Sequence, residues 1–330
     1  MMDVIMDPQG YVNLHPEMRD RWNAAVASSN TGELIDLGIE MAEAGNLETA
    51  SDCFQCAARL GDAVAWFNLG NTLRDLGRAD EASSAYRAAI ALGETDALLN
   101  LGLLLIDSNS WDEAVPHLRQ ATDDGQDHAW HPLGYALLQA GNIEGARAAL
   151  HRAAECADTE GMVTLAFLLR EAGDEHAAVA WLEAAGAAGH PSAAGQVAAW
   201  EWESTRDVAL ESRLRSHAQN SPAARKALAR LLDSSGRPRE AIRVLEEAVA
   251  RGETDHFVHL GNLYHDIGES DRAAQAYARD IETGDPFGHQ NLGALLEEKG
   301  DLDGAIEHYR IGASLGDPMA AESYDRLQGL

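Results

Sequence analysis

Basic side chains are scarce in this sequence. Its 330 residues include 54 aspartates and glutamates but only 25 lysines and arginines, so the formal net charge is −29. Only Lys226 and Lys299 are lysine. A protein that binds nucleic acid through its phosphates needs a basic face. The composition therefore argues against a nucleic-acid partner.

Cysteine and long apolar runs are scarce as well. Three cysteines are too few for a disulfide framework, which favours a reducing compartment. No apolar stretch approaches the roughly 18–20 residues that a membrane-spanning helix needs. Asp3 and Asp7 lie where a secretory signal would be basic. Because 45% of the residues are apolar, we expect a folded cytoplasmic protein with no membrane span.

The acidity has two interpretations. Arginine, alanine and glycine are abundant, which fits a high-GC bacterial genome or adaptation to a salty cytoplasm. The other interpretation is a functional one, in which the acidic surface meets a basic partner. We favour the compositional explanation.

Short motifs recur with a period of about 32 residues, and they stay in step. A Leu-Gly pair or a close relative begins at Leu37, Leu69, Leu101, Leu133, Leu165, Val197, Leu228, Leu260 and Leu292. A mostly glycine position follows at Gly45, Gly77, Asn109, Gly141, Gly173, Thr205, Gly236, Gly268 and Gly300. A large apolar residue recurs at Phe54, Tyr86, Leu118, Leu150, Leu182, Leu214, Leu245, Tyr277 and Tyr309. A fixed period of this length is typical of a repeat architecture.

Each repeat is predicted to be a pair of antiparallel helices of about three turns each. The apolar residues before and after the glycine position fall at helical spacing. The glycine ends the first helix in the left-handed region, which a residue with a Cβ atom enters at a cost. Small residues at Gly70 and Ala82 let the two helices approach closely. Helix-capping acceptors are expected at Asp62, Thr95, Thr254, Asp285 and Asp317.

These motifs resemble the tetratricopeptide repeat. The second repeat carries that family's signature at Trp66, Leu69, Gly70, Leu73, Ala82, Tyr86 and Ala89. The period is shorter than the family's, which is about 34 residues, and the closing proline is missing. Gly-Asp or Gly-Glu openings and the recurring Asn-Leu-Gly are more similar to Sel-like repeats, although the longer loop of those repeats is lacking. The resemblance covers residues 29–330.

The predicted fold class is all-α. We expect a right-handed superhelical solenoid of about nine antiparallel helical hairpins, with capping helices at its ends. Residues 1–28 are an N-terminal segment with a capping helix, residues 29–315 are the nine repeats, and residues 316–330 are a C-terminal capping helix. The sixth repeat, residues 189–220, departs from the pattern, so a local change in curvature is expected there.

The N-terminal capping helix is predicted to run from Pro16 to Ser28. Met18, Trp22 and Val26 lie at helical spacing within it and are expected to pack on the first repeat. Residues 1–10 are expected to be loose.

The resemblance implies that the first helices of the hairpins line a concave groove in which a ligand binds. Asparagine amides can pair with a peptide main chain, and aromatic side chains anchor a partner at little entropic cost. The candidate partner-binding residues are Asn68, Asn71, Arg74, Asn100, His131, Tyr135, Phe167, Arg170, Trp202, Asn262, His265 and Asn291. The alternative is that each is a solvated polar position on an amphipathic helix.

Two asparagine pairs match the positions with which some tetratricopeptide adaptors clamp the terminal carboxylates of a chaperone. These are Asn71 with Asn100 and Asn262 with Asn291. The flanking position that is basic in those adaptors is Phe67 here. We therefore expect an apolar or basic peptide as the ligand.

Residues that carry chemistry are few. Cys53 and Cys56 form a lone CxxC pair, whereas a structural zinc site needs four ligands, so we expect ordinary buried or half-buried thiols. Histidine pairs at helical spacing, for which a metal site is the less favoured alternative, are His128 with His131 and His256 with His259. No phosphate loop or hydrolase motif is present. The sequence predicts no enzymatic activity, no cofactor and no metal.

The functional prediction is a cytoplasmic, non-catalytic scaffold that binds a protein or peptide partner in its groove. The alternative is an acidic inhibitor or nucleic-acid mimic that masks a basic partner. The sequence leaves the partner's identity and the oligomeric state open.

Overall fold

The fold is built from α-helices and short 3₁₀ turns, and the computed structural model contains no strand among the residues that it describes, 16–285 and 287–329. This confirms the predicted all-α class. The helices divide into two units, Met1–Ala178 and Val179–Leu330, which are described separately. The expectation about residues 1–10 lies outside the described residues.

The first unit contains a run of short helices of similar length, most of them 13 residues or about three and a half turns. They are α1 (Pro16–Ser28), α2 (Thr31–Glu43), α3 (Leu47–Arg59), α4 (Ala63–Asp75), α5 (Ala79–Ala91), α6 (Ala97–Asp107), α7 (Trp111–Asp123), η2 (Asp127–Ala129), α8 (Trp130–Gln139), α9 (Ile143–Glu155) and α10 (Thr159–Glu171). Helix α11 (Glu175–Ala187) runs across the boundary between the units.

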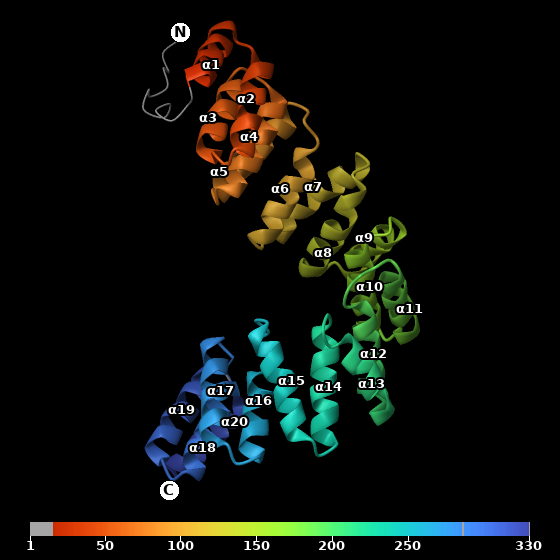
Figure 1. Ribbon diagram of the computed structural model, residues 1–330, viewed down its shortest axis with the longest axis vertical. Coiled ribbons are helices and arrows are strands. Elements are labelled where there is room, and N and C mark those ends of the chain that lie inside the picture. Colours follow the sequence, from red (N-terminus) through yellow and green to blue (C-terminus); the bar gives the residue numbers. More distant parts are fainter. Residues whose placement is uncertain (1–15, 286, 330) are drawn as a thin grey trace. The chain divides into compact units, whose positions relative to one another are not determined.

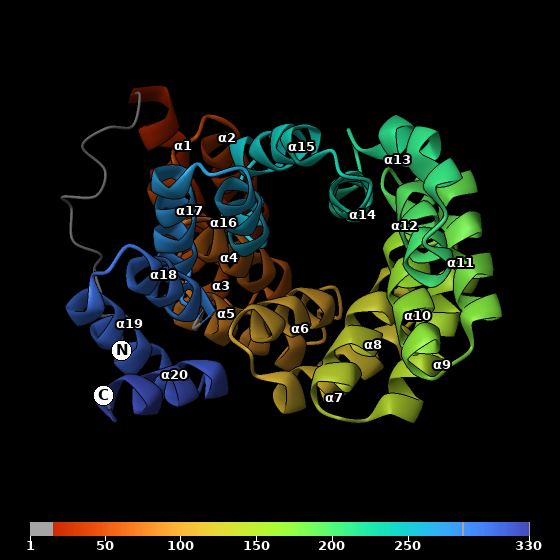
Figure 2. The same cartoon turned by 90° about the horizontal axis from the view of Figure 1, so that it is seen from below.

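The second unit continues the same pattern. Its helices are α12 (Ala193–Thr205), η3 (Val208–Leu210), α13 (Glu211–His217), α14 (Pro222–Ser234), α15 (Pro238–Ala250), α16 (Phe257–Asp266), α17 (Ser270–Glu282), α18 (Phe287–Glu298), α19 (Leu302–Ser314) and α20 (Pro318–Gln328). Along the described chain, nine successive hairpins, α2–α3 to α18–α19, lie between α1 and α20. Figures 1 and 2 show these pairs within each unit.

A close contact between a glycine and a large side chain joins the two helices of most hairpins. A Cβ atom at Gly70 on α4 would lie 2.5 Å from the ring of Tyr86 on α5, which is fully buried. The same geometry recurs sixteen residues apart in the pairs Gly38–Phe54, Gly102–Leu118, Gly134–Leu150, Gly261–Tyr277 and Gly293–Tyr309. The Leu-Gly position and the large apolar position therefore stay in step because they touch.

The glycines between the helices have the predicted left-handed backbone. Gly77 has a φ of 75° and directly follows Leu76, the residue that caps the C-terminus of α4. Asn109 takes the place of glycine in the third hairpin with a φ of 57°, as a residue that tolerates this region. In the sixth hairpin the left-handed residue is Arg206, one position after Thr205.

The predicted helix caps are confirmed in part. The side chains of Asp62 and Asp317 accept hydrogen bonds from the first-turn amides of α4 and α20. Asp285 accepts one from the Phe287 amide at the start of α18. The cap predictions for Thr95 and Thr254 were wrong. Helix α6 begins two residues after Thr95, with Asp96 as its N-cap, and α16 begins three residues after Thr254, with His256 as its N-cap.

Helix α1 has the predicted bounds and packs on the first hairpin. Trp22 and Ala25 are buried with Leu34 and Leu37 of α2, and Met18 packs against this cluster. The prediction for Val26 was wrong, because its side chain is exposed and Ala25 occupies the buried position one residue earlier. Met18, Trp22 and Ala25 follow the spacing of a single helix face.

The sixth hairpin has a shortened second helix. After α12, a 3₁₀ turn over Val208–Leu210 precedes α13, which has only seven residues. Leu214 nevertheless keeps its core position and is fully buried. This hairpin is the one whose sequence departs from the other repeats.

No helix among the described residues is long and apolar enough to cross a bilayer.

We predict that Gly70→Ala lowers the free energy of unfolding by about 1–3 kcal/mol, because the added methyl group forces the buried Tyr86 ring to move. Chemical denaturation measures the change. The loss of stability caused by Gly70→Ala is expected to be smaller when Tyr86→Leu is also present. Alanine and leucine occupy the same two repeat positions in the core of the second unit, at Ala198 with Leu214 and at Ala229 with Leu245. A double-mutant cycle measures this coupling.

Gly186→Ala provides the matched control. Gly186 is also inside a helix, but a Cβ atom there meets only ordinary contacts, the nearest at 3.7 Å. This substitution is expected to stabilise the protein by about 0.5–1 kcal/mol through helix propensity. Equal effects at Gly70 and Gly186 would contradict the steric explanation.

Candidate functional site

The first helices of the first unit bring together most of the predicted groove residues. Helices α6, α8 and α10 contact one another in turn, and α4 precedes them in the same pattern. Equivalent positions on these helices are 32 residues apart in sequence. Side chains at one repeat position therefore form a row across neighbouring hairpins.

One such row carries large exposed apolar side chains. Leu103 on α6, Tyr135 on α8 and Phe167 on α10 are 38%, 37% and 43% exposed. The Tyr135 ring packs edge-on against Trp111 of α7, with the ring centroids 5.7 Å apart. We call Leu103, Tyr135 and Phe167 the apolar stripe. Tyr135 and Phe167 were predicted, whereas Leu103 was missed, although the 32-residue spacing pointed to it.

The asparagines beside the stripe serve the hairpins themselves. Asn71 Oδ1 accepts hydrogen bonds from the Tyr86 hydroxyl and from Asn100 Nδ2, both at 2.8 Å. In the second unit, Asn262 Oδ1 accepts one from the Tyr277 hydroxyl at 2.7 Å. Burial of Tyr86 and Tyr277 raises their hydroxyl pKa values, in the case of Tyr277 to about 12. These asparagine oxygens therefore satisfy buried hydroxyl groups.

The polar residues predicted on these helices are mostly engaged within the protein. His131 Nε2 lies 3.2 Å from the Thr164 hydroxyl on the next first helix. Arg74 donates to the adjacent Asp75 at 3.1 Å. Asn68 on α4 and Arg170 on α10 are half-buried.

Trp202 is not available to a partner. It is 2% exposed and belongs to the main core of the second unit. The Arg206 guanidinium lies 4.4 Å from the centroid of its ring. The sequence prediction for Trp202 was wrong, because α12 turns this side chain into the core.

The remaining predicted residues of the second unit, Asn262, His265 and Asn291, each have a different bonding partner. Asn291 Nδ2 donates to the carbonyl of Phe287 on its own helix at 3.0 Å, so it does not pair with Asn262. His265 Nε2 lies 2.7 Å from a carboxylate oxygen of Glu298 at the end of α18. The two asparagine pairs that look alike in the sequence therefore differ in the structure.

A cavity of about 410 Å³ lies between the first helices α14 and α16 of the second unit. We call it the first-helix cavity. It is lined by Lys226, Arg230, Asp233, Asp255, His256, Val258, His259 and Asn262. Lys226 binds Asp255 at 2.9 Å, and His259 lies 3.4 Å from Asp233. The cavity is therefore polar, and its cations are largely balanced by carboxylates.

The two histidines of this cavity favour the neutral form. Burial lowers the pKa of His256 below its ordinary value of 6.5, against the opposite pull of Asp255. Burial also lowers the pKa of His259, against the pull of Asp233. At neutral pH the positive charge in the cavity therefore comes from Lys226 and Arg230.

The cysteines behave as the sequence suggested. Cys53 is buried in the core of the first unit and Cys56 is half-buried. Burial raises the pKa of the Cys53 thiol to about 12, which makes the reactive thiolate rare at neutral pH. Within the described part of the chain, no three histidine, cysteine or carboxylate side chains converge in a way that could hold a metal ion.

The geometry defines an all-α repeat protein with exposed side chains on its first helices. Models of the tetratricopeptide repeat match residues 99–161 and 218–289, and residues 63–96. These matches together cover about half of the chain. No curated protein matches the sequence.

Solved structures share the fold. A protective antigen of uropathogenic Escherichia coli strains that displays an SLR fold has a TM-score of 0.54 at 22% identity, covering 96% of this chain and 76% of its own. A tetratricopeptide repeat protein from Parabacteroides merdae has a TM-score of 0.50 at 17% identity, covering 84% and 98%. The chain belongs to the tetratricopeptide repeat family.

We predict that the free energy of unfolding falls as the pH drops below about 6.5. The unfolded chain then binds protons that the buried neutral His256 does not bind, so acid favours unfolding. One such histidine contributes at most about 1.4 kcal/mol per pH unit. His256→Asn is expected to reduce the loss of stability between pH 7.5 and pH 5.5, measured by denaturant titration. An unchanged loss in this variant would contradict the prediction.

Proposed function

We propose that the protein is a non-catalytic scaffold that binds a peptide segment of a partner protein on the first-helix face of its first unit. The single observation that carries this proposal is the apolar stripe. Leu103, Tyr135 and Phe167 expose apolar surface at one repeat position on three adjoining helices. Regularly spaced apolar groups suit the alternating side chains of an extended peptide.

The charge of the first unit indicates what kind of peptide fits. Residues 1–178 contain 29 acidic and 10 basic side chains. The excess negative charge attracts an apolar peptide segment that has basic residues beside it and repels an acidic segment. The Asn100 amide nitrogen, which a carboxylate clamp would use as a donor, already donates to Asn71 Oδ1, which weighs against a carboxylate clamp. The ligand is therefore an apolar peptide with basic residues beside it.

We predict that replacing Leu103, Tyr135 and Phe167 together by alanine weakens peptide binding at least tenfold. Loss of buried apolar anchors of this kind typically costs more than 1.4 kcal/mol in binding. A random 12-residue peptide display library, selected on the wild-type protein, supplies the probes. Fluorescence anisotropy with the enriched peptides measures affinity for both proteins.

A matched control removes exposed apolar groups elsewhere in the same unit. Leu60, Leu92 and Ile143 are exposed at helix ends, away from the stripe positions. Their combined replacement by alanine is expected to leave peptide affinity within twofold of wild type. Equal binding by the stripe variant and the wild type would overturn the proposed site.

A second candidate function is masking of a basic partner by the acidic surface. The excess of acidic residues in the first unit favours it. Under this proposal, binding of a partner recovered from the native host should disappear in about 1 M salt, where charges are screened within about 3 Å. Retention of the partner at that salt concentration would contradict masking and favour the apolar stripe.

A further inference from the structure

The basic residues are concentrated in one stretch of the second unit. Residues 206–251 contain ten basic and six acidic side chains, although the whole chain has 25 basic and 54 acidic ones. This stretch is therefore positive within a strongly negative protein. It covers the sixth hairpin after α12, and all of α14 and α15.

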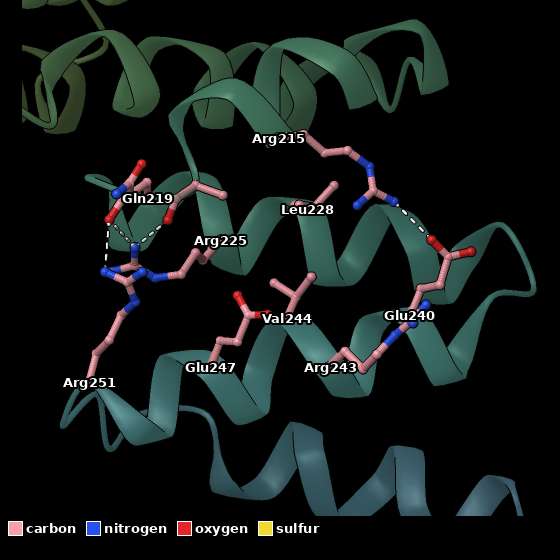
Figure 3. A pocket seen from close by; sticks show the side chains of 10 residues that line it. Arg215, Gln219, Arg225, Leu228, Glu240, Arg243, Val244, Glu247 and Arg251 are labelled. Carbon is pink, nitrogen blue, oxygen red and sulfur yellow. Dashed lines mark hydrogen bonds and ion pairs between the residues drawn. The ribbon is translucent and has the colours of Figure 1, made fainter.

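A cavity of about 570 Å³ opens in this stretch, between the second helices α13 and α15 over one face of α14 (Figure 3). We call it the arginine cavity. Its lining includes four arginines, Arg215, Arg225, Arg243 and Arg251, and two glutamates, Glu240 and Glu247. Helix α14 presents Arg225 and Leu228 here, and Lys226 and Arg230 to the first-helix cavity. The two cavities therefore lie on different faces of the second unit.

At one end of the cavity two guanidinium groups converge on one carbonyl oxygen. Arg225 and Arg251 both donate to the main-chain oxygen of Gln219, at 3.1 and 3.2 Å. Arg225 is buried and is also paired with Glu253. Burial and the neighbouring Arg251 both lower the pKa of Arg225. Among the described residues, no carboxylate lies within ion-pair distance of Arg251.

At the other end, Arg243 is also without a carboxylate partner among the residues that the structure describes. Arg215 is bound there to Glu240 at 3.0 Å. Leu228, Val244 and Glu247 lie between the two ends, as Figure 3 shows. Arg243 and Arg251 are eight residues apart on or just after α15, about 12 Å along the helix axis. The cavity thus has two arginines without a carboxylate partner, separated by two apolar side chains and Glu247.

We propose that the arginine cavity is a second binding site, which takes an acidic peptide segment of a partner protein. Carboxylates of the segment pair with Arg243 and Arg251, and an apolar side chain between them rests on Leu228 and Val244. Four residues of an extended chain span about 13 Å, which matches the separation of the two arginines. This site is separate from the apolar stripe and selects the opposite charge.

The composition of the cavity favours a peptide over nucleic acid. Glu240 and Glu247 line it beside the arginines, and they would repel a continuous run of phosphates. The remainder of the chain is strongly acidic, which adds long-range repulsion of a polyanion. A short peptide with a few carboxylates and an apolar residue carries fewer negative charges, so both costs are smaller for it.

The probe is a labelled synthetic peptide with two Glu-Glu pairs separated by three residues, the middle one a leucine, so that the inner glutamates lie four positions or about 13 Å apart. Its counterpart replaces every glutamate by glutamine. Fluorescence anisotropy with the full chain is expected to show at least tenfold tighter binding of the glutamate peptide, weakened by added salt. Arg243→Gln with Arg251→Gln is expected to reduce that affinity at least tenfold.

The control variant, Arg239→Gln with Arg310→Gln, loses the same charge outside the cavity lining and is expected to bind within twofold of wild type. Equal losses in both double variants would overturn the site, since net charge alone would explain them. Equal binding of the two peptides, or tighter binding of a 12-nucleotide single strand, would overturn the ligand class. A wild-type dimer that the cavity variant converts to a monomer would assign the cavity to a second copy.

Circular dichroism melting of each variant checks folding, and Arg243→Gln alone provides the test if the double variant unfolds. Arg243 forms no ion pair among the described residues, so its replacement removes no internal contact of that kind. The alanine variant of the apolar stripe is expected to bind the glutamate peptide as the wild type does. Failure of one site is therefore distinguishable from failure of the other.

Discussion

The close contact of two helices at a glycine is the constraint on which each hairpin depends. Where the first helix carries glycine, the second helix places a large side chain directly against its backbone, as Tyr86 does at Gly70. Where the first helix carries Ala198 or Ala229, the opposing core residue is a leucine. Leucine also lies opposite glycine, at Gly102 and Gly134, whereas the aromatic rings in these pairs all lie opposite glycine. A glycine on the first helix therefore permits the larger side chain on the second, as close packing requires.

This packing determines which side chains remain for function. The Leu-Gly residues of each first helix face the second helix of the hairpin. The side chains at its other repeat positions form rows across neighbouring hairpins. The row with Leu103, Tyr135 and Phe167 stays exposed, whereas Asn71 is drawn into the support of Tyr86. A scaffold of this kind varies its recognition by changing surface residues while the hairpin contacts stay the same.

Charge adds a second level of organisation. The first unit has an excess of acidic residues, but residues 206–251 are positive. Five arginines of this stretch, Arg243 and Arg251 of the cavity among them, have no carboxylate partner among the described residues. Guanidinium groups without a carboxylate partner, beside the apolar side chains of Leu228 and Val244, suit an external anion better than they suit the fold. The net charge of −29 therefore does not predict the ligand of either proposed site. The apolar stripe favours a peptide with basic residues beside its apolar segment, and the arginine cavity favours a peptide with carboxylates.

The repeat period, the all-α class and the left-handed positions followed from the sequence alone, because helix periodicity and glycine's backbone freedom are local properties. The bounds of α1 also followed from the sequence. The helical spacing predicted Val26 in the core, whereas Ala25 is the residue buried there. Only the tertiary structure decided that Trp202 is buried, that Asn71 binds Tyr86 while Asn291 turns back to its own helix, and that four arginines share one cavity. These outcomes depend on the rotation of each helix and on contacts between residues distant in sequence, which periodicity does not encode.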